Sequence, residues 1–149
     1  MCSYCGCESE VVIAELMSEH AAMALMAGQV GAALQAGDRQ RALAVCAEIS
    51  ALWERHGHKE ELGLFAELRA DPIATGTVAE LEQDHRRLSA ALAGAAGATQ
   101  GELLSTLAEL LDHANREDTD VFPTALQVVP DLAWERVAQV HRAAAGAAA

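Results

Sequence analysis

One pattern occurs twice in the chain, at residues 53–65 (WERHGHKEELGLF) and at residues 110–122 (LLDHANREDTDVF). In each copy a histidine is followed four residues later by a glutamate and nine residues later by a phenylalanine. A spacing of four residues places the histidine and the glutamate on the same face of an α-helix. The repeat therefore predicts two helices that each present a His-x-x-x-Glu pair on one side.

A second histidine precedes each of these pairs. Residues 16–20 (LMSEH) and 81–85 (LEQDH) both begin with leucine and end with an acidic residue followed by histidine. The two histidines of a unit are 36 residues apart in the first copy, from 20 to 56, and 28 apart in the second, from 85 to 113. A duplicated unit of this kind predicts a site with pseudo-twofold symmetry.

All four histidines lie on apolar stripes with helical spacing. Ile13, Leu16 and Met23 flank the first histidine, and Ile49 and Leu52 precede the second by seven and four residues. The histidines and both glutamates should therefore face the core, where an unpartnered carboxylate costs several kcal/mol. Bound cations would satisfy these groups. The candidate metal ligands are His20, His56, Glu60, His85, His113 and Glu117.

Some neighbouring residues are alternative metal ligands, and others are expected to have no part in metal binding. His58 precedes Glu61 by three residues and competes with His56, but the repeat and the apolar stripe favour His56. Glu61 and Glu82 are candidates for an additional oxygen donor, although neither lies on the best-aligned stripe. Residues expected to pack in the core rather than to bind metal are Trp53, His141, Cys46, Met17, Met23 and Met26.

The composition favours an all-α protein of a single domain. The chain has 149 residues, 52% of them hydrophobic but only 3% aromatic, which disfavours a β-sandwich or barrel. Glycine and proline breakers predict an up-down-up-down four-helix bundle with a short extra C-terminal helix. We expect helices at about 8–36, 38–70, 77–93, 101–122 or beyond, closed by Pro123 and Pro130, and 131–141. The predicted regions are a tail at 1–7, the bundle with its last helix at 8–142, and a frayed alanine-rich tail at 143–149.

The charge and the first residues exclude several classes of function. A formal net charge of −12 argues against a nucleic-acid partner and against an anionic membrane surface. We expect no apolar run long enough for a membrane span and no signal peptide, and hence a cytoplasmic protein.

Three of the four cysteines, Cys2, Cys5 and Cys7, are crowded at the start of the chain. They are too close together to staple a fold of this size, and no structural disulfide is predicted. A flexible tail, a redox-active thiol group and a partial metal site remain the alternatives for this segment.

Four imidazoles and two carboxylates suit iron, manganese or zinc. If both glutamates bridge, each ion receives two histidines and two bridging oxygens. Four donors satisfy a tetrahedral zinc ion but leave a six-coordinate iron about two positions short. Such positions would accept water, hydroxide, dioxygen or peroxide.

The ordered set His20, His56-x-x-x-Glu60, His85 and His113-x-x-x-Glu117, followed by Val121-Phe122-Pro123, resembles the hemerythrin-like proteins with an HHE cation-binding domain. The resemblance implies two iron ions in an oxo- or hydroxo-bridged, non-haem di-iron centre inside a four-helix bundle. The ferritin-like alternative uses Glu-x-x-His pairs, an order that this chain reverses.

The chain departs from the oxygen-carrying hemerythrins at one ligand. Those proteins have two histidines one turn apart on the third helix and a final aspartate five residues after a histidine. Here Leu81 and Ser89 lie one turn on either side of His85, so the site has one histidine fewer. The departure favours reaction with O2 or hydrogen peroxide, in a catalase-like or peroxide-scavenging role, over reversible oxygen carriage. The alternatives are a non-catalytic module that binds or senses iron, O2 or NO, and a structural zinc bundle.

Overall fold

The computed structural model describes residues 10–146, and these residues form helices and short connections without a β-strand. The prediction of an all-α chain is therefore confirmed. Two π-helical turns, η2 (Glu60–Leu64) and η4 (Glu117–Val121), and one 3₁₀ turn, η3 (Ala95–Gly97), interrupt or connect the α-helices. The α-helices are α1 (Val11–Gln35), α2 (Arg39–Lys59), α3 (Phe65–Leu68), α4 (Ala74–Ala93), α5 (Gln100–Arg116), α6 (Phe122–Val128) and α7 (Asp131–Gly146).

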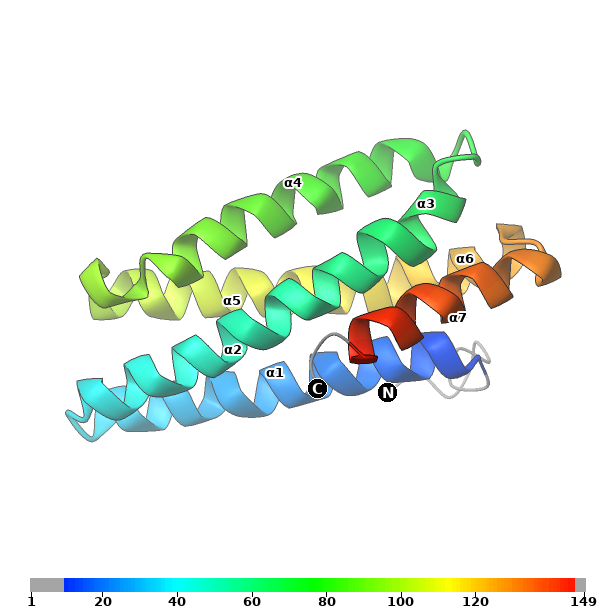
Figure 1. Cartoon of the computed structure of the whole chain (residues 1–149). Coiled ribbons are helices and arrows are strands. Elements are labelled where there is room, and N and C mark those ends of the chain that lie inside the picture. Colours follow the sequence, from blue (N-terminus) through cyan, green and yellow to red (C-terminus); the bar gives the residue numbers. More distant parts are fainter. Residues whose placement is uncertain (1–9, 147–149) are drawn as a thin grey trace.

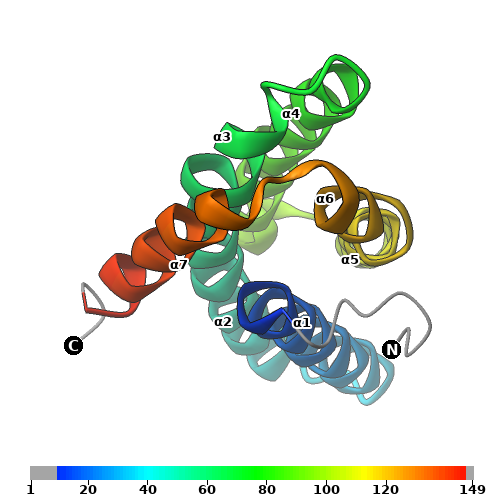
Figure 2. The same cartoon turned by 90° about the vertical axis from the view of Figure 1, so that its right-hand side faces the viewer.

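Four long helical rods lie side by side and alternate in direction (Figure 1). The first rod is α1, the second is α2 continued through η2 into α3, the third is α4, and the fourth is α5 continued through η4 into α6. Packing joins α1 to α2 and α5, and α4 to the same two helices. Helix α7 lies on the outside of this arrangement and contacts α1, α2 and η2 (Figure 2).

Local sequence signals account for the tight connections. Gly37 has a φ of +75°, and the amide of Asp38 donates to the carbonyl of Ala33 at 2.9 Å, which together form a glycine-terminated helix end. The Asp38 side chain then accepts a hydrogen bond from the amide of Arg41 at 2.9 Å and caps α2. Two long helices are thus joined by a turn of a few residues, which forces them to run antiparallel.

Two helix boundaries differ from those expected. The third rod begins at Ala74, three residues before the expected start. The fourth rod continues past Pro123 and ends at Val128, before Pro130, within the expected range of residue 122 or beyond. Pro123 stands in the first turn of α6, directly after a π-helical turn. A proline lacks only an amide that the first turn of a helix leaves unpaired, so it does not end this rod. Helix α7 extends to Gly146, beyond the expected end near residue 141.

The apolar core consists of two clusters. One cluster contains Leu16 of α1 and Phe65 of α3, and the other contains Met23 of α1 and Trp53 of α2. On every rod, the predicted histidine lies between residues of the first cluster and residues of the second. A layer of polar side chains therefore crosses the middle of the core.

The expectation that no apolar stretch approaches the length of a membrane span is wrong for helix α1. Among the described residues it is the one helix long and apolar enough to cross a membrane by length and composition, with a mean hydropathy of 1.3. The many alanines of α1 contribute to that value, and the inward face of α1 packs in both core clusters. Its apolar character is therefore also explained by packing within this fold.

Candidate metal centre

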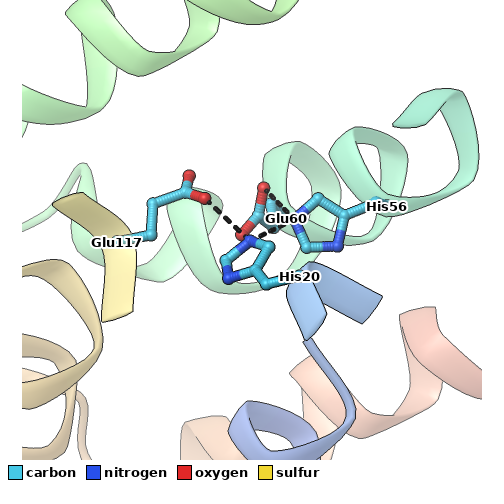
Figure 3. A group of neighbouring side chains, drawn as sticks. All are labelled: His20, His56, Glu60 and Glu117. Atoms are coloured by element: carbon cyan, nitrogen blue, oxygen red, sulfur yellow. Dashed lines mark hydrogen bonds and ion pairs between the residues drawn. The ribbon is translucent and has the colours of Figure 1, made fainter. Parts of the chain in front are cut away.

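The six predicted ligands meet in the polar layer of the core. His20 comes from α1, His56 from the last turn of α2, and Glu60 begins η2. Figure 3 shows these three side chains pointing toward one another and toward Glu117, which begins η4. His85 of α4 and His113 of α5 complete the set, and all six residues are buried. Each rod thus contributes one histidine, as the repeat predicts.

The two glutamates lie between the two pairs of histidines. Oε2 of Glu117 lies 3.2 Å from Nε2 of His20, and its Oε1 lies 3.1 Å from Nε2 of His113. Oε2 of Glu60 lies 3.3 Å from Nε2 of His56 and 3.2 Å from Nε2 of His85. Two groups of four potential ligands result, one with each histidine pair, and both groups contain Glu60 and Glu117.

A π-helical turn follows α2 and another follows α5, and both occupy the same position in the repeat. Both turns begin at the inward glutamate and end one residue before the phenylalanine of the repeat, Phe65 or Phe122. π-Helical turns are rare and concentrate at functional sites. The sequence analysis missed them, although the identical His-x-x-x-Glu-x-x-x-x-Phe spacing in both copies was the signal that the two rods share one local geometry.

Acidic residues next to the glutamates hold the outer nitrogens of two histidines. Nδ1 of His20 lies 2.8 Å from Asp118, and Nδ1 of His85 lies 2.9 Å from Glu61. Asp118 and Glu61 are each the residue directly after an inward glutamate. A carboxylate that accepts the Nδ1 proton leaves Nε2 free to bind a metal and fixes the orientation of the ring. The proposed extra donor Glu61 therefore lies behind His85, on the side away from the glutamates.

The other two histidines face acidic residues that precede a histidine in the sequence. Nδ1 of His56 lies 2.9 Å from Oε2 of Glu19, whereas Nδ1 of His113 lies 3.6 Å from Oδ2 of Asp84. In the sequence these acidic residues stand out only as part of the repeat, directly before His20 and His85. Their function is visible only once the rods are placed side by side.

Aromatic rings enclose the polar layer on both sides. The ring centroid of Trp53 lies 5.1 Å from the ring centroid of His85 and 5.1 Å from that of His113. On the opposite side Phe65 stacks on His85 at 5.8 Å and Phe122 stacks on His20 at 5.7 Å. The prediction that Trp53 is a core residue is confirmed. These rings keep bulk water away from the buried glutamates.

Many buried polar atoms of this layer lack hydrogen-bond partners among the described residues. Both carboxylate oxygens of Glu60 and of Glu117 are buried without one, as are Nε2 of His85 and both ring nitrogens of His113. Leaving so many buried polar groups unsatisfied is unfavourable by about 1–3 kcal/mol for each group. Divalent cations with mixed nitrogen and oxygen ligands fit this donor set.

Protons supply part of the missing positive charge in the metal-free chain. Burial lowers the pKa of His20, but the hydrogen bond to Asp118 and the ion-pair contact with Glu117 outweigh burial and raise that pKa to about 10. Burial acts in the same direction on His85, and its contacts with Glu60 and Glu117 raise that pKa to about 9. Both rings are therefore protonated at neutral pH, and metal binding has to displace protons.

The metal-free protein should consequently lose stability in alkaline solution. Because both pKa values are raised on folding, the stabilisation is complete below about pH 6.5 and is lost as the pH rises through 9 and 10. Urea unfolding of chelator-treated protein at pH 7, 8 and 9.5 measures this loss. The metal-loaded protein is the control, since its histidines bind the ion in their neutral form. A metal-free protein that is equally stable at pH 7 and 9.5 would contradict the expectation.

The remaining candidates lie outside the layer. His58 is exposed, and Glu82 pairs with Arg69. His141 is buried, as predicted for a packing residue, and its Nδ1 lies 2.9 Å from Glu15. Cys46 is buried and free, while Cys2, Cys5 and Cys7 lie outside the described residues.

Four helical rods and a buried cluster of four histidines and two shared glutamates define a helical protein with a candidate cation site. The family model of the hemerythrin HHE cation-binding domain matches residues 11–125, which is more than half of the chain. The chain therefore belongs to the hemerythrin HHE cation-binding domain family. Searches of curated proteins and of solved structures found no match.

Proposed function

We propose that the four rods form a four-helix bundle that holds two iron ions and reacts with O2 or hydrogen peroxide, in a catalase-like or peroxide-scavenging role. The observation that supports this most directly is the pair of four-ligand groups that share Glu60 and Glu117. Two groups that share both carboxylates suit two ions bridged by those carboxylates. The first ion would lie between His20 and His56, and the second between His85 and His113.

Iron in this donor set would keep coordination positions open, as the proposed reaction requires. Each position offers two imidazole nitrogens and two carboxylate oxygens, which suit borderline divalent metals. Zinc would be satisfied by four ligands, whereas iron binds up to six and would keep positions for a small molecule. Cys46 packs in the core cluster with Met23 and Trp53 and belongs to neither ligand group. No thiolate among the described residues therefore biases the site toward copper or an iron–sulfur cluster.

The residues of the chain orient the ligands and pack around them. Asp118, Glu19 and Glu61 hold the outer nitrogens of three histidines, so that Nε2 of each ring faces the interior. Trp53 and the two phenylalanines of the repeat pack against the histidine rings from opposite sides. When bound, iron that alternates between the ferrous and ferric states would relay two electrons from one molecule of hydrogen peroxide, which is oxidised to O2, to a second molecule, which is reduced to two of water.

The missing third-helix histidine favours peroxide over reversible oxygen carriage. Leu81, one turn before His85, is buried in the apolar core and offers no ligand atom. Ser89, one turn after His85, lines a hollow next to that histidine. The second position therefore has fewer protein ligands than in oxygen carriers and more room for an external one.

Metal analysis and oxygen release test the proposal. Protein produced with ample iron should contain about two iron ions per chain and absorb in the near ultraviolet, and addition of hydrogen peroxide should release O2. His85→Ala should abolish O2 release and lose at least one ion, whereas the exposed control His58→Ala should match the wild type. Two bound iron ions without O2 release would favour a binding or sensing module. Recovery of zinc alone would refute the di-iron assignment.

A further inference from the structure

The duplicated unit extends beyond the metal ligands to two charged positions. The residue before each inward glutamate is basic, Lys59 in the first copy and Arg116 in the second. A glutamate also lies five residues before the first histidine of each copy: Glu15 precedes His20, and Glu80 precedes His85. These matched residues allow a direct comparison of the two halves of the site.

In the first half the basic residue is buried and binds two carboxylates. The Lys59 side chain is 5% exposed, and its Nζ lies 2.6 Å from Glu15 and 2.5 Å from Glu19. Glu19 also accepts the hydrogen bond from Nδ1 of His56 at 2.9 Å. Lys59 therefore fixes the carboxylate that orients one of the two histidines of this half.

Helix α7 covers this cluster from outside. Nδ1 of His141 lies 2.9 Å from the second oxygen of Glu15. Val137 approaches so closely that a Cβ on Gly63 would lie only 3.2 Å from its side chain. A chain of contacts thus runs from α7 through Glu15, Lys59 and Glu19 to His56.

In the second half the same positions face solvent. The Arg116 side chain is 37% exposed and pairs with Glu80, which is itself 65% exposed. Asp84, the counterpart of Glu19, pairs with Arg87 at 2.9 Å and stays 3.6 Å from Nδ1 of His113. His113 therefore has no close outer partner to hold its ring.

A hollow of about 380 Å³ between α2 and α4 also reaches this half. His85, Gly57 and Ser89 are among the residues that line it. The absence of a side chain on Gly57 keeps the hollow open, since a Cβ there would lie 3.2 Å from Nδ1 of His85. Solvent can therefore approach the outer edge of the second histidine pair.

We infer that the two metal positions are unequal: the first, between His20 and His56, retains its ion under the Lys59 cluster and α7, and the second, between His85 and His113, exchanges its ion with solvent. The inference rests on the proposed dinuclear site. Loss of an outer partner of a metal-bound histidine typically weakens metal binding 10–100-fold. We therefore expect the affinities and release rates of the two positions to differ by roughly that factor.

Cobalt(II) is a suitable probe because it binds the same nitrogen and oxygen ligands. Metal-free protein crystallised with one equivalent of Co²⁺ should show anomalous scattering between His20 and His56, and protein with two equivalents should show it at both positions. A chelator should remove one ion about 10–100 times faster than the other. Equal occupancy at one equivalent, or occupancy of the second position first, would overturn the inference while leaving the dinuclear site intact. A failure to bind Co²⁺ at all would overturn the proposed function as well.

The matched basic residues supply the variants. Lys59→Met should speed release of the slowly exchanging ion toward the rate of the fast one, and Arg116→Met should leave both rates unchanged. Lys59→Arg, which keeps the positive charge, should restore part of the difference. Helical circular dichroism checks that each variant is folded, and the wild-type crystals decide the order of binding even where a variant fails to fold. Equal effects of Lys59→Met and Arg116→Met on release would also overturn the inference.

Discussion

Removal of the metal is expected to lower the melting temperature of the protein by roughly 10 °C. The buried histidines and glutamates leave ring nitrogens and carboxylate oxygens unpaired, and an ion that binds these atoms only in the folded state stabilises that state. An ion present at about 1,000 times its Kd contributes about 4 kcal/mol, and each kcal/mol shifts the melting temperature of a domain this long by about 2–4 °C. Protonation of His20 and His85 offsets part of this loss at neutral pH.

Thermal unfolding of iron-loaded and chelator-treated protein, followed by circular dichroism, measures the shift. His58→Ala is the matched control, because this histidine is exposed and belongs to neither ligand group. It should show the same difference between the two forms as the wild type. Coincident melting curves for loaded and metal-free wild type would show that the buried cluster is not a metal site.

The inward direction of the four histidines could be predicted from the sequence alone. Apolar residues at helical spacing surround His20 and His85, and an amphipathic helix has only one face to bury. The duplication then indicated which of His56 and His58 faces the core. His56 is buried between the two core clusters and His58 is exposed, so the pattern distinguished two histidines that are only two residues apart.

The π-helical turns could not be predicted in this way. A spacing of four residues between His56 and Glu60 is compatible with an ordinary α-helix, and no residue type marks a π-helical turn. Pro123 follows the second of these turns without ending the rod, because a proline is tolerated in the first turn of a helix. Local rules failed where the backbone at the site is irregular.

The partners of the outer nitrogens depend on tertiary contacts. Glu19 and Asp84 occupy matched positions in the sequence, yet only Glu19 lies within hydrogen-bond distance of its histidine. Lys59 is likewise a residue type that is usually exposed, and its burial depends on the two glutamates of α1 and on the packing of α7. The symmetry of the sequence therefore predicted the buried layer of histidines and glutamates but concealed the difference between the two halves.

Glu117→Gln is expected to reduce the metal content from two ions per chain to one or fewer. The Glu117 carboxylate reaches both histidine pairs, with one oxygen 3.2 Å from His20 and the other 3.1 Å from His113. Burial and Glu60 act to raise the pKa of Glu117, but its close contacts with His113 and His20 outweigh them and lower that pKa, so the native group is a carboxylate. An amide is neutral and would present an NH2 group toward one of the two positions, so it cannot bridge two cations.

The adjacent Asp118→Asn variant separates bridging from orientation. Asp118 touches only the outer nitrogen of His20, at 2.8 Å, and an asparagine oxygen can still accept that hydrogen bond. This variant should keep two ions with an affinity weakened by about 10–100-fold at most. Metal analysis after equilibrium dialysis against graded iron distinguishes the two effects, since a lost bridge lowers the plateau and a misoriented ligand shifts the midpoint. Two ions at wild-type affinity in Glu117→Gln would show that this carboxylate does not join the two positions. A lowered plateau in Asp118→Asn would show that the outer carboxylate itself holds the metal.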